Sequence, residues 1–185
     1  HETQRDARHL LVLGSMDYQP NSAGLVSFLQ TCWPNLLAKH PDLQLSIVGR
    51  GERPRDLLEL PGGVRWVGAL EDVRPWLARA TALLVPLEVG GGTRLKILEA
   101  LAMQCPVIST VTGAEGLRVA SEQHVWLSPN IAGLTERIGE VLRAPEQIQT
   151  KAGAARDVVL RQYDWRESAK QLAASWSRCI GSSDS

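Results

Sequence analysis

The sequence is poor in cysteine and carries no net charge. Its three cysteines, Cys32, Cys105 and Cys179, are odd in number, lie far apart and match no C-x-x-C spacing. This usage predicts buried thiols in a reducing compartment rather than a disulfide framework. The formal net charge of +0 at pH 7 argues against sequence-independent binding to nucleic acid or to an acidic membrane surface.

Two further absences restrict the class of protein. No apolar run approaches the ~18 residues that a membrane-spanning helix requires. The four histidines are scattered and form no H-E-x-x-H motif, so a zinc site is not expected. We therefore expect neither a metal nor another cofactor.

The sequence instead shows a regular alternation of short apolar runs with longer, helix-like stretches. Six runs are predicted as strands, at residues 9–14, 43–49, 64–68, 82–87, 106–110 and 124–127. Helices are predicted at 21–39 (with Asn21 or Ser22 as the N-cap), 54–60, 71–80, 93–104, 131–143, 145–163 and 165–180. The alternation predicts an α/β fold, a Rossmann-like parallel sheet of about six strands with helices on both faces. We expect one domain over residues 1–180 and a disordered, Ser-rich tail over residues 181–185.

Glycine-bearing loops follow most of the predicted strands. The glycines are Gly14, Gly49, Gly51, Gly68, Gly90, Gly91, Gly92 and Gly113. Parallel sheets of this kind bind ligands at the carboxyl ends of their strands. We therefore expect these loops to converge on one edge of the sheet and to form a binding site there.

The most informative stretch is residues 90–102, with the sequence GGGTRLKILEALA. Its glycines allow close approach to the backbone, and a helix that begins after them presents free N–H groups. Arg94 and Lys96 fall in the first predicted turn, where the helix dipole disfavours cations and so suggests a bound anion, above all phosphate. Glu99 follows roughly 7–9 Å along the helix axis, about the reach from a diphosphate to a ribose. The motif predicts a nucleotide-diphosphate site.

The motif is not a Walker P-loop, which needs four residues between a glycine and Gly-Lys-Ser/Thr. It is not a dinucleotide fingerprint either, because Leu95 stands where the third glycine belongs. Taken alone, the stretch has an alternative interpretation as a loop with a solvated Arg, Lys and Glu. The basic run Arg50, Arg53 and Arg55 after the second strand is likewise either a phosphate patch or a solvated face.

Taken together, these motifs resemble the C-terminal half of GT-B-fold glycosyltransferases of the group 1, family 4-like type. The resemblance runs in order over about residues 9–180. The matching segments are residues 14–18 with 20–21, 47–51, 67–68, 91–102, and 106–110 with 113–117. The segment 91–102 is the most specific of them.

The resemblance implies that this half of the enzyme binds a nucleoside-diphosphate sugar, the donor. It implies that an N-terminal GT-B half of the same protein, absent from this chain, supplies the acceptor site. Glu99 corresponds to the glutamate that holds the ribose hydroxyls, and residues 67–70 fall where the base is held. The expected donor-binding residues are Gly14, Gly49, Arg50, Gly68, Leu70, Gly91, Gly92, Thr93, Arg94, Leu95 and Glu99, with Arg94 and Lys96 as catalytic residues that stabilise the departing diphosphate.

The chain departs from the family pattern at two places. The common motif has two glutamates with seven residues between them, and counting back from Glu99 gives Gly91. The contact of the first glutamate with the donor sugar is therefore missing or is made differently, which marks a Gly-Gly-Thr-Arg variant. The basic pair that many relatives carry after the first strand is also missing, and Arg94, Lys96 or Arg50 are the candidates to replace its charge.

The implied reaction is transfer of a sugar from the donor to an acceptor, with retention of the anomeric configuration. No Asp-x-Asp pair is present to hold a metal on the donor, so the reaction is expected to be metal-independent. The isolated chain is expected to be inactive and cytoplasmic, with membrane association at the inner face only through the missing half. The alternatives are a GT-B-type sugar-nucleotide epimerase or hydrolase, and a stand-alone nucleotide-binding module without catalysis.

Overall fold

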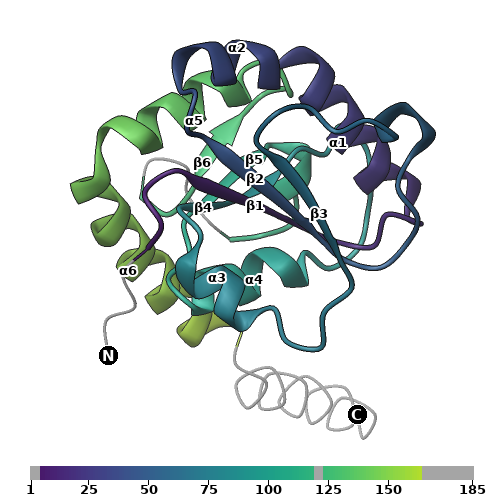
Figure 1. Cartoon of the computed structure of the whole chain (residues 1–185). Helices are drawn as coiled ribbons and strands as arrows, with labels where there is room; N and C mark the ends of the chain where they lie inside the picture. The colour runs from purple at the N-terminus through teal and green to yellow at the C-terminus, as the bar shows by residue number, and fades with distance from the viewer. Residues whose placement is uncertain (1–4, 119–122, 164–185) are drawn as a thin grey trace, which may run out of the picture.

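A sheet sandwiched between two layers of helices makes up the part of the chain that the computed structural model describes, residues 5–118 and 123–163 (Figure 1). The predicted helix 165–180, the tail 181–185 and Cys179 lie outside these residues. Cys32 and Cys105 are buried, free thiols, as predicted. No helix of the described ranges is long and apolar enough to cross a membrane.

The six predicted strands are all present and pair in parallel. They are β1 (His9–Leu13), β2 (Gln44–Val48), β3 (Val64–Gly68), β4 (Ala82–Val85), β5 (Val107–Thr110) and β6 (Trp126–Ser128). Their order across the sheet is β3-β2-β1-β4-β5-β6, which confirms the Rossmann-like α/β fold. The chain reverses direction across the sheet between β1 and β4, and open parallel sheets bind ligands at such a switch point.

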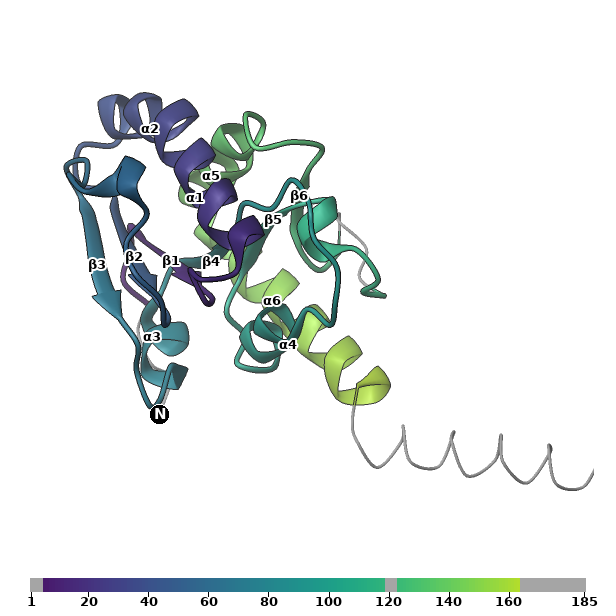
Figure 2. The same cartoon turned by 90° about the vertical axis from the view of Figure 1, so that its right-hand side faces the viewer.

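The helices cover both faces of this sheet. They are α1 (Gln19–Thr31), α2 (Trp33–Lys39), α3 (Arg74–Arg79), α4 (Leu95–Ala102), α5 (Leu134–Arg143) and α6 (Pro145–Gln162), with short 3₁₀ turns η1 (Arg55–Leu57) and η2 (Thr112–Ala114). Helices α1, α2 and α5 lie on one face, and α3, α4 and α6 lie on the other (Figures 1 and 2).

Alternation along each strand divides the interior into two cores. Successive side chains of a strand point to opposite faces. Leu10 of β1 accordingly packs in the cluster that contains Phe28 of α1, whereas Leu11 packs in the cluster that contains Ile97 of α4. Because both faces are covered, the strands read as continuous apolar runs rather than as alternating ones.

The helix predicted over residues 21–39 is two helices, and the prediction of its start was wrong. Helix α1 begins at Gln19 with Tyr18 as N-cap, not with Asn21 or Ser22. The break falls at Cys32 because Pro34 has no N–H to donate to the carbonyl four residues earlier and its ring crowds that carbonyl.

Four other predicted helices are shorter in the structure by three or more residues, and one of them, 131–143, begins only at Leu134 as α5. The segment 54–60 forms only η1, and the segment 71–80 is helical only as α3. The segment 93–104 is helical only as α4, since Arg94 has φ −80° and ψ 51° and Gln104 has φ 55°. Arg94 therefore precedes the first turn of α4 as its N-cap. The prediction that Arg94 lies in the first turn was wrong.

Candidate functional site

The ends of β1, β2 and β3 meet at one edge of the sheet through three glycines. The Gly14 N–H donates to Val48 O at 3.1 Å, and the Gly49 N–H donates to Gly68 O at 2.8 Å. A Cβ at Gly49, where φ is +150°, would lie 1.8 Å from Gly14 O. Only glycine allows this approach, so the predicted convergence of these loops is confirmed.

The loops after β4 and β5 lie at the same edge, beyond the switch point. Gly90 and Gly92 have φ values of +136° and +91°, which favour glycine in the β4–α4 loop. The Thr110 hydroxyl donates to Leu87 O and accepts a hydrogen bond from Gly113 N at 3.0 Å. This hydroxyl fastens the loop after β5 to the loop after β4.

Arg94 is turned into the protein. The residue is only 6% exposed. Its guanidinium donates to Gly90 O at 2.9 Å, to Gly91 O at 3.2 Å and to Thr112 O at 2.8 Å. Its Nε is buried and has no hydrogen-bond partner among the described residues. Arg94 therefore ties the glycine loop to the loop after β5, and its predicted contact with phosphate stays a prediction.

Lys96, in the first turn of α4, crosses the switch point. Its Nζ donates to Leu13 O at 3.0 Å and to Asn21 Oδ1 at 2.8 Å. Nζ also lies 3.1 Å from the position that a Cβ on Gly14 would take. The ammonium group therefore lies at the end of β1.

The environment of Lys96 is unusual for a cation. Burial, and to a smaller extent the charge of Arg94, together lower the pKa of Lys96 from 10.5 to about 8. Its two hydrogen-bond partners are neutral oxygens, and no carboxylate pairs with it among the described residues. A bound anion would supply the missing countercharge.

Several other predicted binding residues are exposed around this edge. Glu99 is exposed on α4, and its carboxylate makes no hydrogen bond or ion pair within the described ranges. Gly91, Gly92, Thr93, Leu95 and Leu70 are also exposed. They are accessible to a ligand, but their predicted roles stay predictions.

The basic run after β2 does not act as one patch. Arg50 Nε lies 3.4 Å from Ser15 Oγ in the β1–α1 loop, at the site edge. Arg53 instead lies over the ring of Trp66, 5.6 Å from its centroid, and donates to Leu58 O. Only Arg50 of the three contacts the β1–α1 loop.

Exposed apolar side chains surround this edge, which the sequence interpretation missed. Five large apolar residues that follow strand ends are exposed: Tyr18, Leu70, Val89, Leu95 and Val111. Leu58 and Leu160 are the only other large apolar residues exposed in the described parts of the chain. The available signal was their position in the segments that follow the predicted strands; of the five, the sequence predicts a ligand contact only for Leu70 and Leu95. No three metal-ligating side chains come together within residues 5–118 and 123–163.

The family described as "Glycosyl transferases group 1" matches residues 7–144. The chain belongs to this family. A glycogen synthase of Mycobacterium tuberculosis is 30% identical over 176 residues, which are 89% of this chain and 41% of that protein. A phosphatidyl-myo-inositol mannosyltransferase of Mycolicibacterium smegmatis is 24% identical over 96% of this chain and 47% of its own length. The chain thus spans less than half of the length of these two relatives.

Solved structures share the fold of this glycosyltransferase chain. Sucrose-phosphate synthase of Thermosynechococcus elongatus has a TM-score of 0.75 and 23% identity, over 96% of this chain and 47% of its own. HepE of Anabaena, solved with UDP and glucose, has a TM-score of 0.73 and 16% identity, over 91% and 48%. The C-terminal domain of a group 1 glycosyl transferase of Francisella tularensis has a TM-score of 0.68 and 16% identity, over 88% and 89%. Of these three structures, the Francisella domain is the most similar to this chain in length.

Proposed function

We propose that this chain is the donor-binding half of a two-domain glycosyltransferase, which transfers a sugar from a nucleoside-diphosphate sugar to an acceptor. The observation that carries the proposal is the partly buried Lys96 ammonium at the switch point, which has two neutral partners and no carboxylate beside it among the described residues. Membership of the group 1 family supports the transferase activity. The UDP and glucose held by the similar HepE structure support the class of donor.

The geometry favours a particular placement of the donor. The diphosphate would lie at the end of β1, against Lys96 and the N–H groups of the Gly90–Gly92 loop. Glu99 is three residues further along α4, about 4.5 Å at ~1.5 Å per residue, so its carboxylate would reach the ribose hydroxyls. Leu70, exposed after β3, would contact the base.

Lys96 would also stabilise the leaving group. Cleavage of the anomeric bond places negative charge on the departing diphosphate, and a cation already held in place stabilises that charge without reorganisation. One preorganised donor of this kind contributes roughly 2.7–4 kcal/mol to transition-state stabilisation in comparable oxyanion sites. Arg94 would act through the loop that it holds, because three of its five N–H groups donate to carbonyls of that loop and of the loop after β5. We propose that no metal takes part and that the configuration is retained.

The acceptor site is proposed to lie on an N-terminal half that this chain does not contain. The exposed apolar residues at the edge, Val89 and Val111 among them, would contact that half. The chain alone would then bind the donor and turn nothing over. An epimerase or a hydrolase would instead consume the donor without an acceptor.

Phosphorus NMR of the chain with UDP-glucose and with GDP-mannose tests this proposal. We expect line broadening of the diphosphate signals of one donor and no free nucleoside diphosphate after prolonged incubation. The Lys96→Met variant should lose the broadening, whereas a Lys39→Met variant on α2, away from this edge, should keep it. Release of nucleoside diphosphate without an acceptor would favour the hydrolase, and unbroadened signals for both donors would contradict donor binding by this half.

A further inference from the structure

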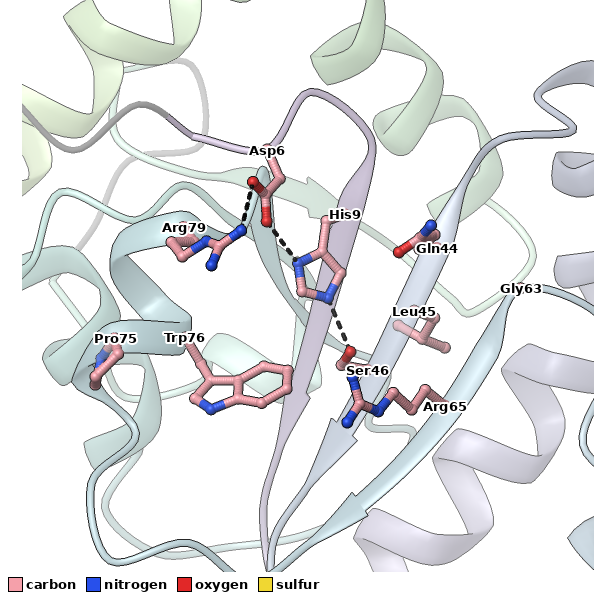
Figure 3. Close-up of a pocket in the computed structure, with 10 residues that line it drawn as sticks. All are labelled: Asp6, His9, Gln44, Leu45, Ser46, Gly63, Arg65, Pro75, Trp76 and Arg79. Carbon is pink, nitrogen blue, oxygen red and sulfur yellow. Dashed lines mark hydrogen bonds and ion pairs between the residues drawn. The ribbon is translucent and has the colours of Figure 1, made fainter.

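A second concave site lies on the α3 side of the sheet, near the amino-terminal ends of the strands. It is a cavity of about 400 Å³. Its lining includes His9 at the start of β1, Ser46 on β2 and Arg65 on β3, with Trp76 of α3 forming one wall (Figure 3). The donor edge lies at the opposite ends of these strands, so this site takes no part in the function proposed above.

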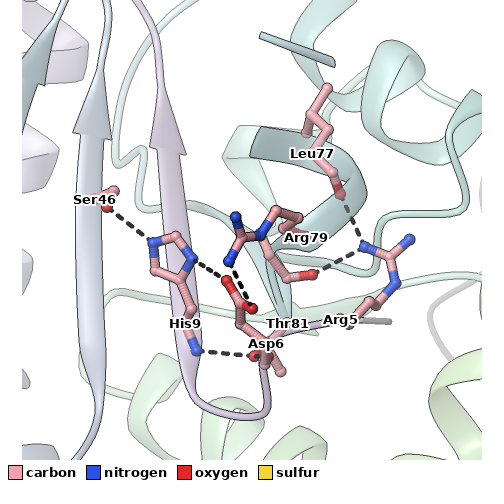
Figure 4. Close-up of polar contacts among 8 residues, drawn as sticks. Arg5, Asp6, His9, Ser46, Leu77, Arg79 and Thr81 are labelled. Atoms are coloured by element: carbon pink, nitrogen blue, oxygen red, sulfur yellow. Dashed lines mark hydrogen bonds and ion pairs between the residues drawn. The ribbon is translucent and has the colours of Figure 1, made fainter. Parts of the chain in front are cut away.

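Ser46, His9 and Asp6 form a connected polar chain in this cavity. Ser46 Oγ and His9 Nε2 are 2.8 Å apart, within hydrogen-bond distance. On the other side of the ring, His9 Nδ1 lies 3.5 Å from Asp6 Oδ2 (Figure 4). A hydroxyl beside an imidazole that a carboxylate orients is the arrangement that activates a serine nucleophile.

Independent contacts hold Asp6 in place. Its backbone N–H donates to Arg79 O at 2.7 Å, and its carboxylate pairs with Arg79 Nη2 at 3.3 Å. The Thr81 hydroxyl donates to Asp6 O and accepts a hydrogen bond from His9 N at 2.9 Å. The segment that carries the carboxylate and the start of β1 are thus fastened to the same corner between α3 and β4.

The imidazole of His9 and the hydroxyl of Ser46 are also positioned by their neighbours. The His9 ring packs against Trp76 with the ring centroids 6.2 Å apart and an interplanar angle of 59°. Arg65 is the direct cross-strand partner of Ser46, so its side chain lies on the same face of the sheet. The Arg65 guanidinium lies over the Trp76 ring, 6.0 Å from its centroid, and lines the same cavity as Ser46. This cation is the group available to stabilise an oxyanion formed at Ser46.

Burial, more than the charges around it, keeps the His9 ring neutral near pH 7. Burial lowers the pKa of His9 below its usual 6.5. The charged groups that face it act in both directions: Asp6 raises its pKa, whereas Arg79 of α3 and Arg65 of β3 lower it. A neutral imidazole can accept the proton of Ser46, which a charged one cannot.

We propose that Ser46 is the nucleophile of an acyl-transfer site that hydrolyses short acyl esters, with His9 as general base and Asp6 as its positioning residue. Ser46 Oγ bonds to the acyl carbon while its proton moves to His9 Nε2 and the carbonyl π pair moves to the oxygen beside Arg65. Return of that pair breaks the bond to the alkoxide, which takes the proton from His9. Water then attacks the acyl-Ser46 ester by the same route, releasing the carboxylic acid and restoring the serine.

A fluorophosphonate probe, which labels activated serines, tests the proposal on the whole chain. We expect peptide mass spectrometry to find the label on Ser46, and hydrolysis of p-nitrophenyl acetate to fall with labelling. The Ser46→Ala variant should lose both. The His9→Gln variant, which keeps Ser46, should be labelled about 10²–10⁴-fold more slowly. Ser109→Ala, which removes a buried hydroxyl bonded to Val85 O and Thr110 O, is the matched control and should leave both unchanged.

A pH series separates catalysis from a merely structural polar cluster. Labelling should increase as the pH rises through the lowered pKa of His9, and Asp6→Asn should shift that midpoint downward because the charge that raises the pKa is lost. Thermal unfolding of each variant shows whether it is folded. Absence of label on Ser46 in the folded wild-type chain, or equal labelling rates in wild type and His9→Gln, would overturn the proposal.

Discussion

Two cations that are two residues apart in the glycine motif have different surroundings. The Arg94 guanidinium has three carbonyl partners within its own loops. The Lys96 ammonium reaches the end of another strand and lacks a counterion among the described residues. The sequence predicts contact with a bound anion for both cations. The structure favours Lys96 for this contact, because the Arg94 guanidinium is already hydrogen-bonded to carbonyl oxygens.

The lowered pKa of Lys96 predicts that nucleotide binding takes up a proton. The free protein has a Lys96 pKa of about 8, so above that pH much of Lys96 is neutral. A bound diphosphate favours the charged form and raises this pKa, so binding above pH 8 should be coupled to protonation, whereas binding well below it should not. Calorimetry in buffers of different ionisation enthalpy measures the proton count. A binding enthalpy independent of the buffer above that pH would contradict contact with Lys96.

Replacement of Arg94 predicts a loss of stability as well as of function. Arg94→Ala should lower the free energy of unfolding by roughly 2–3 kcal/mol, because three part-buried hydrogen bonds from a charged donor are lost. The matched control, Arg8→Ala, removes a surface pair with Asp42 and should change it by no more than about 1 kcal/mol. Denaturant unfolding measures both. Equal stabilities for Arg94→Ala and wild type would mean that the glycine loop does not depend on this side chain.

Among the elements, α1 and α4 position the site, because both begin at the switch point. The packing of α1 depends on Gly24, where a Cβ would lie 1.8 Å from Pro86 O. This close approach brings the helix against the segment after β4 and places Asn21 within reach of Lys96. The first turn of α4 supplies Lys96 itself.

Gly24 and Gly153 provide a matched test of this close approach, because both lie inside helices. Gly24→Ala should destabilise the protein by about 1–3 kcal/mol, since backbone atoms must move apart. Gly153→Ala in α6 meets no atom within 4 Å and should stabilise it by about 0.5–1 kcal/mol. Thermal or denaturant unfolding measures whether each substitution lowers or raises the stability of the protein. A stabilising Gly24→Ala would show that α1 does not pack closely on that segment.

The strands could be predicted from the sequence, and several helix boundaries could not. Each strand is a buried apolar run with a turn residue after it, which is a local signal. The break before α2 depends on the missing N–H of Pro34, and the late start of α4 depends on tertiary bonds of Arg94 to Thr112. Contacts of that kind join residues that the sequence does not show to be neighbours.

At the scale of the whole molecule, strand order explains both sites. The order β3-β2-β1-β4-β5-β6 brings the predicted glycine loops to one edge, so the convergence of these loops was predictable from the sequence. The same order places β1 beside β2 and so brings His9 to Ser46, 37 residues further along the chain. No motif marks that pair, because neither residue lies in a recognisable pattern.

Calorimetric titration of the chain with UDP, GDP, TDP and ADP tests the donor site most directly. The account predicts selective binding of one nucleotide. It predicts that Glu99→Ala weakens this binding at least about tenfold, or ~1.4 kcal/mol, whereas Glu136→Ala on the exposed surface of α5 does not. Binding of none of the four, or equal affinities for wild type and Glu99→Ala, would contradict the assignment of this edge as the nucleotide site.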